Sequence, residues 1–457
     1  MGLFEMLPQV GGVAGTVAAF LVVLGVVVFV HEYGHYIVGR WCGIHAEVFS
    51  IGFGREIFGW VDKRGTRWRV AVLPLGGYVK FLGDADAASA RPDDAALARM
   101  SSGDRSRTFP DAALWRRALT VAAGPAFNFA LAIVIYAVLA GVLGMGSDRP
   151  VVGVRADAAP EIEALREGDE ILAVAGTEVR VFADIQRAYD AAAEETPGRE
   201  VFPVALRRDG RTIEVETGPL VPPVVGSVAQ GAPAERAGLR PGDRILSVDG
   251  APVASFSDLQ RSIRASGERP VTLALRDPGG VERAVTLEPK LNPAPTPGGG
   301  IELRPLIGVT AVPLIGPESR TPGPIEAAGH GVERTWQVIS ASLTYVGAIV
   351  TGRTDASGLG GPIRIATLSG DAAASGLVTF IGMIALISAS IGMINLFPIP
   401  VLDGGHILFA SIEGATRRPV SPRIVGLAHR VFAALLITLF VFLTFRDALW
   451  WVFRLRP

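Results

Sequence analysis

Four long stretches without a charged residue constrain the fold of this chain more than any other feature. These stretches are Met6 to Val30, Ala118 to Ser147, Ala372 to Leu402 and the shorter Val431 to Phe445. About 20 consecutive apolar residues allow a helix to cross the hydrocarbon core of a bilayer. We therefore predict four membrane-spanning helices. The fourth spans only if Arg430 and Arg446 extend their side chains toward the lipid headgroups.

The composition agrees with a membrane protein that carries soluble parts. Charged residues make up 19% of the chain, whereas about 25% is usual for soluble domains. The 43 Lys and Arg residues nearly balance the 44 Asp and Glu residues, which excludes a strongly basic nucleic-acid-binding protein. Cys42 is the single cysteine, so an intrachain disulfide framework and a cysteine-cluster metal site are also excluded.

The first apolar stretch differs from a cleaved signal peptide. Glu5 is the only charged residue before it, so a basic leading segment is missing. The stretch also continues directly into His31 and Glu32 instead of a small-residue cleavage site. We expect it to be retained as the first spanning helix.

The positions of Lys and Arg predict the orientation in the membrane, because connections rich in these residues stay in the cytoplasm. Residues 41–115 are rich in both, and the short turn 413–423 carries Arg417, Arg418 and Arg423. We expect these two segments to be cytoplasmic. Both termini and residues 148–370 should then face the periplasm of a Gram-negative cell, and the protein should be a multi-pass protein of the inner membrane.

Residues 148–370 contain an internal repeat. Arg166-Glu-Gly-Asp-Glu-Ile-Leu-Ala-Val-Ala-Gly176 is matched by Arg240-Pro-Gly-Asp-Arg-Ile-Leu-Ser-Val-Asp-Gly250. The period is too long for a solenoid and indicates two similar domains. The second copy, in which Ala232-Pro-Ala-Glu-Arg-Ala-Gly-Leu precedes that string, resembles a PDZ domain of the bacterial, circularly permuted kind. We expect a degenerate first PDZ domain at 148–220 and a second at 221–290.

The PDZ resemblance implies a β-rich domain that binds an extended peptide by its free C-terminus. In the second copy, the expected loop that offers backbone N–H groups to the terminal carboxylate consists of Val225, Gly226, Ser227 and Val228. A β-rich spacer without a peptide groove is the alternative for each copy.

Residues 291–370 are predicted to connect the second repeat copy to the third span. The segment from Pro293 to Pro324 is rich in Pro and Gly and includes a β segment over Ile301–Val312. From Ile325 to Val350 the apolar residues recur at helical spacing. This pattern predicts an amphipathic helix near the membrane face; a helix packed on the two repeat domains is the alternative.

The end of the first span carries the sharpest chemical signal, His31-Glu32-Tyr33-Gly34-His35. Residues four apart lie on one face of a helix, about 6 Å apart along its axis, so both imidazoles can reach one ion. The Glu between them can take a proton from an attacking water molecule. Ionisable groups beside an apolar span are costly to bury, and a divalent cation compensates them. Zinc is the usual ion for such nitrogen and oxygen ligands; satisfied interfacial histidines at a helix end are the alternative.

A catalytic zinc site needs a third protein ligand. His45 lies just past the first helix, and His330 and His429 lie in other regions. Asp403 and His406 occur in Asn395-Leu-Phe-Pro-Ile-Pro-Val-Leu-Asp-Gly-Gly-His406. Its two prolines should break the helix in the membrane, where irregular backbone is tolerated only around a cavity. Asp403 and His406 are thus both candidate ligands, and the amide of Asn395 could stabilise an oxyanion.

Together the two motifs resemble the site-2 protease family (M50) of intramembrane zinc metalloproteases, in particular its bacterial regulator-of-sigma-E protease branch with tandem PDZ domains. Further stretches agree with this resemblance: Phe49-Ser-Ile-Gly-Phe-Gly54, Leu73-Pro-Leu-Gly-Gly-Tyr-Val-Lys80, Ala123-Gly-Pro-Ala-Phe-Asn-Phe129 and Gly360-Gly-Pro-Ile-Arg-Ile365. The last of these departs from the family's usual Ser-Gly-Pro-Val-Gly-Ile and leaves the role of Arg364 open.

The resemblance implies a multi-pass α-helical membrane protein with four spans, a membrane-associated β-hairpin or sheet, and two periplasmic PDZ domains. The first two spans and the β region would occupy residues 1–147, and the last two spans residues 371–457. It also implies one zinc ion per chain near the cytoplasmic side, held by His31, His35 and Asp403 rather than His406. Glu32 would be the general base, and Asn395 would aid the substrate or the oxyanion.

The β region is expected over residues 48–82, with a Gly-Gly turn in the stretch Leu73–Lys80. Its exposed edge could hold an unwound substrate by strand addition; a structural lid is the alternative. Expected substrate contacts are Gly76, Gly77, Tyr78, Asn395, Pro398 and Pro400. We assign Tyr33, Gly34 and Cys42 to packing.

The resulting functional hypothesis is an intramembrane zinc endopeptidase that makes the second cut of regulated intramembrane proteolysis. By resemblance, its substrates are single-pass proteins such as anti-sigma factors and remnant signal peptides, and the PDZ pair admits substrates whose periplasmic domain has been trimmed. One alternative is a membrane-anchored PDZ scaffold or chaperone that does not cut. A metal transporter is a second alternative, but it would need ionisable residues in more than one span.

Overall fold

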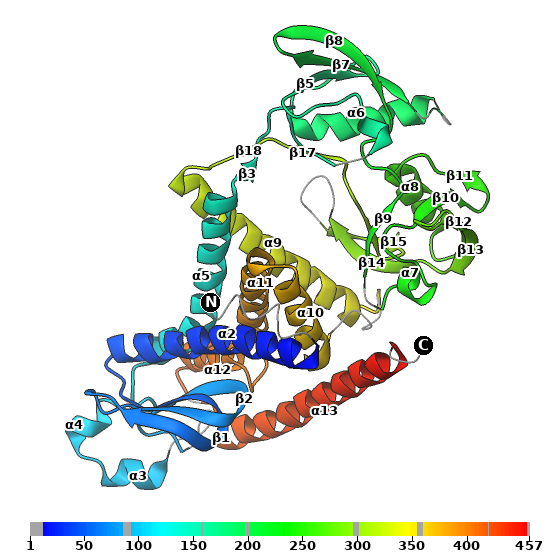
Figure 1. Cartoon of the computed structure of the whole chain (residues 1–457). Helices are drawn as coiled ribbons and strands as arrows, with labels where there is room; N and C mark the ends of the chain where they lie inside the picture. The colour runs from blue at the N-terminus through cyan, green and yellow to red at the C-terminus, as the bar shows by residue number, and fades with distance from the viewer. Residues whose placement is uncertain are drawn as a thin grey trace. The chain divides into compact units, whose positions relative to one another are not determined.

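The computed structural model describes residues 12–85, 93–156, 159–196, 199, 201–229, 231–295, 301–353, 360–418 and 420–454. The chain divides into two compact units. The membrane unit comprises Met1–Leu139, Pro324–Ser340 and Leu359–Pro457, and the repeat unit comprises Ala140–Gly323 and Ala341–Gly358. We describe each unit by itself (Figure 1).

Four helices are long and apolar enough to cross a membrane among the described residues, as the sequence predicts. They are α2 (Val13–Trp41), α5 (Leu114–Leu143), α11 (Leu377–Asn395) and α13 (Pro422–Arg454). Residues 6–11 of the first predicted span lie outside the described residues. Helix α13 extends beyond the uncharged stretch at both ends and includes charged residues there: Nε of Arg430 donates to the Gly426 carbonyl, and Arg446 lies 3.9 Å from Asp447.

The third uncharged stretch does not form one helix. Helix α10 (Pro362–Ala374) precedes α11, and α12 (Asp403–Thr416) follows a non-helical connection over residues 396–402. This confirms the predicted break at the two prolines, which cannot donate a backbone hydrogen bond. The chain then folds back tightly: a Cβ on Gly404 or Gly405 would collide with the carbonyl oxygens of residues 396 and 399. Only glycine fits immediately after Asp403.

Helix α2 lies at the centre of the membrane unit, against α10, α11 and the β-sheet (Figure 1). Ala19, Val23 and Val27 form an apolar core with Phe380 and Ile384. Helix α5 approaches α2 closely, because a Cβ on Gly34 would lie 2.5 Å from the Ala123 carbonyl oxygen. Tyr33 stacks on Phe29, and Cys42 is a buried free thiol, so the packing roles predicted for Tyr33, Gly34 and Cys42 are confirmed.

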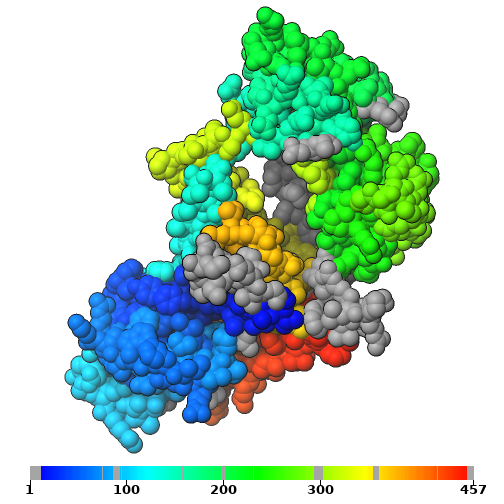
Figure 2. All heavy atoms as spheres, viewed as in Figure 1, coloured from blue at the N-terminus to red at the C-terminus, as the bar shows by residue number. Residues whose placement is uncertain are grey.

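The predicted β region is an antiparallel hairpin of β1 (Ala46–Val61) and β2 (Arg67–Phe81). Both strands bend, so Phe49 is paired with Val79 on one side and with Trp68 on the other. The prediction of a Gly-Gly turn is wrong, because Gly76 and Gly77 lie inside β2. Helices α3 (Asp94–Arg99) and α4 (Ser102–Arg105) adjoin the hairpin, and these four elements form the lighter blue and cyan part of this unit in Figure 2.

The repeat unit contains two copies of one arrangement, each a four-stranded sheet with one helix of more than ten residues; the second copy also has the short helix α7 (Pro233–Arg236). The first has sheet order β6-β5-β7-β8, from β5 (Glu170–Val174), β6 (Thr177–Glu178), β7 (Phe202–Arg208) and β8 (Arg211–Thr217), with α6 (Phe182–Glu195). The second has order β11-β10-β12-β13, from β10 (Arg244–Val248), β11 (Ala251–Pro252), β12 (Val271–Arg276) and β13 (Glu282–Leu287), with α8 (Phe256–Ser266).

The repeated Arg-x-Gly-Asp string has the same structural role in both copies. Asp169 and Asp243 are each 1% exposed, and each accepts a backbone hydrogen bond from the Arg three residues earlier. Arg208 and Arg283 pair with them at 2.6 Å. A buried carboxylate is tolerated only when it is paired in this way. The internal repeat predicted from the sequence is therefore also a structural repeat.

The connector after the second copy contributes strands that pair with both copies. After the hairpin of β14 (Lys290–Pro295) and β15 (Ile301–Leu306), strand β16 (Val309–Ala311) pairs with β9 (Val225–Val228). Strand β17 (Ile315–Pro317) pairs with β4 (Val152–Arg155), and β18 (Ser319–Arg320) pairs with β3 (Met145–Gly146). Helix α9 (Pro324–Val350) follows, where the sequence predicts a helix.

The pairing of β9 corrects one prediction. Val225, Gly226, Ser227 and Val228 form a strand and not a loop. Val225 N–H donates to the Asp243 carbonyl at 2.8 Å, and β16 pairs with the opposite edge. The segment therefore does not present an open row of N–H groups, because its backbone groups serve the copy's own strands. Peptide binding by the repeat copies stays a prediction.

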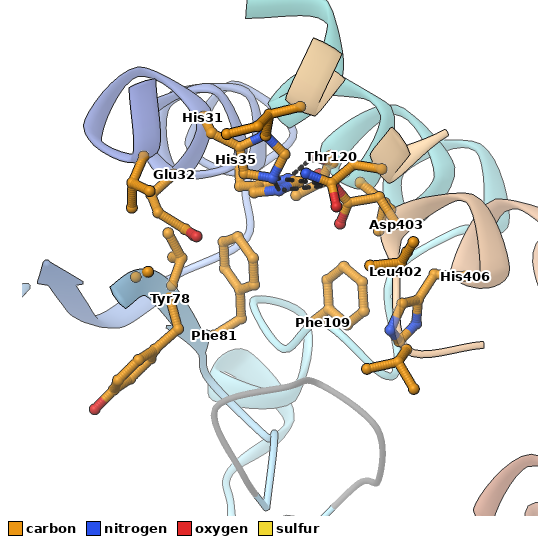
Figure 3. A pocket seen from close by; sticks show the side chains of 18 residues that line it. His31, Glu32, His35, Tyr78, Phe81, Phe109, Thr120, Leu402, Asp403 and His406 are labelled. Atoms are coloured by element: carbon orange, nitrogen blue, oxygen red, sulfur yellow. Dashed lines mark hydrogen bonds and ion pairs between the residues drawn. The ribbon is translucent and has the colours of Figure 1, made fainter. Parts of the chain in front are cut away.

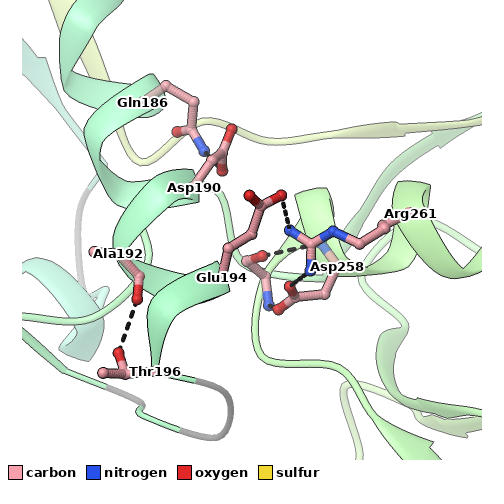
Figure 4. A network of polar contacts seen from close by, with 8 residues as sticks. Gln186, Asp190, Ala192, Glu194, Thr196, Asp258 and Arg261 are labelled. Carbon is pink, nitrogen blue, oxygen red and sulfur yellow. Dashed lines mark hydrogen bonds and ion pairs between the residues drawn. The ribbon is translucent and has the colours of Figure 1, made fainter.

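Among the residues described in these domains, two ion pairs link the two copies. Arg244 lies 2.8 Å from Glu161, next to the short 3-10 helix η1 (Pro160–Ile162), and Arg261 lies 3.1 Å from Glu194. Figure 4 shows Arg261 reaching from α8 to Glu194 while also contacting Asp258 on its own helix. Arg261 and Glu194 are about half-exposed or more, so this pair contributes little stability.

Candidate metal centre

Two histidines on α2 face the same point. His31 and His35 are 8% and 7% exposed, and their Nε2 atoms lie 3.2 Å apart. Their four-residue spacing places both rings on one helix face. Figure 3 shows the two rings converging. The pairing that the sequence predicts for these two side chains is present.

Asp403 completes this group from the far end of the sequence. Its Oδ2 lies 3.1 Å from Nε2 of His31 and 3.5 Å from Nε2 of His35. One ligand atom from each of the three residues lies within 4.8 Å of the others, and no other such group occurs among the described residues. Helix α12 begins at Asp403 and is tied to α5 by Arg117, whose Nη2 lies 2.7 Å from Oε1 of Glu413.

The residues fit a divalent cation. Oδ2 of Asp403 is buried and accepts no hydrogen bond of ordinary geometry from any described residue, which is costly for a carboxylate unless a cation is bound. Nδ1–H of His35 donates to the Thr120 carbonyl at 2.9 Å. This tautomer leaves the lone pair of Nε2 free for a metal ion. Two imidazoles and one carboxylate form a ligand set typical of catalytic zinc.

Glu32 lies beside this group and is 9% exposed. It shares a cavity of about 290 Å³ with His31, His35, Asp403 and Asn395. Figure 3 shows its carboxyl group directed into the space above Phe81. The wall opposite belongs to β2: a Cβ on Gly77 would lie 2.9 Å from Cγ of Glu32. The cavity thus brings an acid–base group and a strand edge to the metal ligands.

The structure brings most of the predicted substrate contacts to this cavity. Gly76, Gly77, Tyr78 and Asn395 line it, while Pro398 and Pro400 do not belong to its described lining. The two prolines instead shape the connection before α12, where Val401 and Leu402 reach the cavity. A substrate contact by the prolines stays a prediction.

The remaining histidines do not join the group. His406 borders the cavity, but its ring packs against the ring of His429 at 5.6 Å between centroids. His45 lies in the connection after α2, where its Nδ1 is 3.3 Å from Nη2 of Arg107. His330 is part of α9. The structure therefore favours Asp403 over His406 as the third ligand.

Sequence reasoning missed the contribution of α5. Gly124 lies directly against the imidazoles, because a Cβ there would collide with Nε2 of His35 and lie 2.9 Å from Cε1 of His31. Asn128, one turn further, is fully buried with Nδ2 3.2 Å from Nδ1 of His31. The sequence does offer one signal for Asn128: it is a single amide side chain in an uncharged spanning stretch, and a polar group in a membrane needs a polar partner.

Comparison with known proteins identifies the family. The family model described as Peptidase family M50 matches residues 19–439. A Rhizobium meliloti protein named as a zinc metalloprotease is 37% identical over 442 residues, which cover 95% of this chain and 96% of that protein. The regulator of sigma-E protease RseP of Escherichia coli is 34% identical over 456 residues, which cover 94% and 97%.

Proposed function

Because the chain belongs to peptidase family M50 and is a zinc metalloprotease of the membrane, we propose that it cleaves peptide bonds inside the transmembrane segments of single-pass proteins. The observation that carries this proposal is the meeting of His31, His35 and Asp403 next to Glu32. The three ligands come from the end of a spanning helix and from the break that follows another. This is where a protease for membrane segments needs its reaction centre.

His31, His35 and Asp403 would hold one zinc ion per chain. When bound, zinc lowers the pKa of a water molecule and polarises the scissile carbonyl. Glu32 takes the proton of the attacking water and returns it to the leaving amine, because its carboxylate shares the cavity with the ligands. The amide of Asn395, which also lines the cavity, donates a hydrogen bond to the oxyanion.

The edge of β2 would hold the substrate. Gly76, Gly77 and Tyr78 line the cavity beside Glu32, and β1 pairs with this part of β2 on one side. An unwound substrate segment can pair with the other side as an added strand. The exposed apolar side chains Ile57 and Phe58, at 67% and 63%, would hold the hairpin at the lipid bilayer. Substrates with helix-weakening residues should be cut fastest, because a helical amide must first be freed.

We assign the enzyme to the bacterial inner membrane, with both termini and the repeat unit in the periplasm and the zinc site near the cytoplasmic side.

The repeat copies would act as PDZ domains that recognise free C-termini and admit trimmed substrates, so that this enzyme makes the second cut. Two relatives are named regulator of sigma-E protease, which supports anti-sigma factors as substrates; remnant signal peptides are the other class. The family does not favour a non-catalytic scaffold.

The test uses the purified full chain and a reporter with one transmembrane segment. Wild-type enzyme should cut the reporter, a chelator should stop cutting, and added zinc should restore it. Glu32→Gln should bind zinc yet not cut, whereas Glu47→Gln, the same exchange at an ion-paired residue of the hairpin, should cut normally. Cutting by Glu32→Gln or by the chelated enzyme would contradict the proposal.

A further inference from the structure

Asn128 occupies a position for which the reaction described above gives no role. It lies on α5 within a spanning helix, is 0% exposed, and places Nδ2 3.2 Å from Nδ1 of His31. The other nitrogen of that ring, Nε2, faces Asp403 and His35. The amide of Asn128 therefore contacts the side of the imidazole that is remote from the metal ligands.

The amide also has a buried atom to satisfy. Oδ1 of Asn128 accepts no hydrogen bond from any described residue, while Nδ2 faces His31. Half a turn about the Cβ–Cγ bond exchanges the two amide atoms without changing the shape of the side chain. In that orientation Oδ1 accepts the proton of Nδ1, and the lone pair of Nε2 is free. In the observed orientation Nδ2 donates to Nδ1, and the ring proton must sit on Nε2.

We propose that Asn128 is a positioning residue for the metal centre: its Oδ1 accepts Nδ1–H of His31 and so fixes the tautomer and the ring orientation that bind zinc. This inference rests on the proposed role of His31 as a zinc ligand. For His35, the backbone carbonyl of Thr120 accepts the Nδ1–H hydrogen bond at 2.9 Å and so fixes the tautomer of that ring. Each histidine thus receives its own acceptor from α5, and residues 120–128 of that helix form the outer wall of the metal site.

Helix α11 packs closely against the turn of α5 that carries Asn128. Ser388 Oγ on α11 donates to the backbone carbonyl of Asn128 at 2.9 Å, a bond to the main chain and not to the amide group. A Cβ on Gly392 would lie 3.2 Å from Cβ of Asn128 and 3.1 Å from the Pro125 carbonyl oxygen. The absence of a side chain at Gly392 therefore lets α11 lie directly against Asn128, whose side chain is fully buried. A rigid partner of this kind is what a metal-binding histidine requires.

The experiment measures the zinc affinity of the purified full chain by competition with a chromogenic chelator. Asn128→Leu keeps the bulk of the side chain and removes the acceptor, and zinc should bind roughly 10- to 100-fold more weakly. Asn128→Asp can only accept a hydrogen bond from Nδ1–H, so zinc should bind at least as tightly as in wild type. Ser388→Ala removes a neighbouring buried hydrogen bond that does not reach His31, and should bind zinc like wild type. The visible spectrum of bound Co²⁺ should change in Asn128→Leu only.

The results distinguish the positioning role of Asn128 from the proposed metalloprotease function. Wild-type affinity in Asn128→Leu, or an equal loss in Ser388→Ala, overturns the positioning role while the metalloprotease assignment stands. If Asn128→Leu does not fold, weakened zinc binding by Asn128→Asp overturns it in the same way. Wild-type protein that binds no zinc at all contradicts the proposed function itself, which the chelator titration reports separately.

Discussion

Oδ2 of Asp403 lies 3.1 Å from Nε2 of His31, although these residues stand near opposite ends of the chain. Neither residue alone can hold a metal ion, so the centre exists only where α2 and the start of α12 meet. Metal binding and the packing of the membrane unit are therefore coupled.

This coupling predicts that zinc stabilises the protein. An ion that binds only the folded state at 100 times its dissociation constant adds about 2.7 kcal/mol to the free energy of unfolding. A chelator should therefore lower the Tm of wild type and of Glu32→Gln, but not that of Asp403→Asn. A thermal melt in detergent measures this, and equal chelator shifts in wild type and Asp403→Asn would contradict it.

Gly124 predicts a second effect on the metal centre. A Cβ at this position would collide with Nε2 of His35, so Gly124→Ala should lose stoichiometric zinc even though Ala favours helix by about 1 kcal/mol over Gly. Gly141→Ala on the same helix meets nothing within 4 Å and should retain zinc. Metal analysis of both purified variants checks this. Full zinc occupancy in Gly124→Ala would show that α5 does not abut the ligands.

Gly77 predicts a loss of rate without a loss of metal. A Cβ there would lie 2.7 Å from the Ser50 carbonyl oxygen and 2.9 Å from Cγ of Glu32, so Gly77→Ala must displace either the strand edge or the base. Misplacing a reacting group by about 1 Å can cost roughly 100-fold in rate. We expect kcat on the membrane reporter to fall strongly while zinc content stays at the wild-type level. An unchanged kcat would show that the position of the β2 edge does not affect the reaction.

His45 predicts a pH effect outside the spanning helices. Burial first, and then the nearby Arg107 and Arg40, lower the pKa of His45 below 6.5. A more open form binds the proton more readily, so the stability contributed by neutral His45 is complete above pH 6.5 and declines as the pH falls through the lower pKa. The backbone bonds from His45 to Arg107 and from Leu82 to His45 should exchange hydrogen faster in acid, after correction for intrinsic rates. His45→Gln should remove this extra acid sensitivity; its persistence would assign the effect to other groups.

The sequence predicts those parts of the structure that local patterns encode. The spacing of His31 and His35, the uncharged stretches and the two prolines before Asp403 each constrain their own neighbourhood, and all three appear as expected. The contacts of Gly124 and Asn128 were not predicted, because no periodicity in α5 tells which helix it will face. The prediction of a loop at Val225–Val228 was wrong for the same reason: the strand that pairs with this segment, β16, lies far along the chain.

We propose that Asp403, and not His406, completes the zinc site begun by His31 and His35. Zinc-edge X-ray absorption of Asp403→Cys can decide this, because a thiolate ligand lies about 2.3 Å from zinc, whereas nitrogen and oxygen ligands lie at about 2.0–2.2 Å. Wild type, in which Cys42 is the single cysteine, and His406→Cys serve as controls. We expect sulfur scattering in Asp403→Cys alone; sulfur scattering in His406→Cys, with none in Asp403→Cys, would contradict the account.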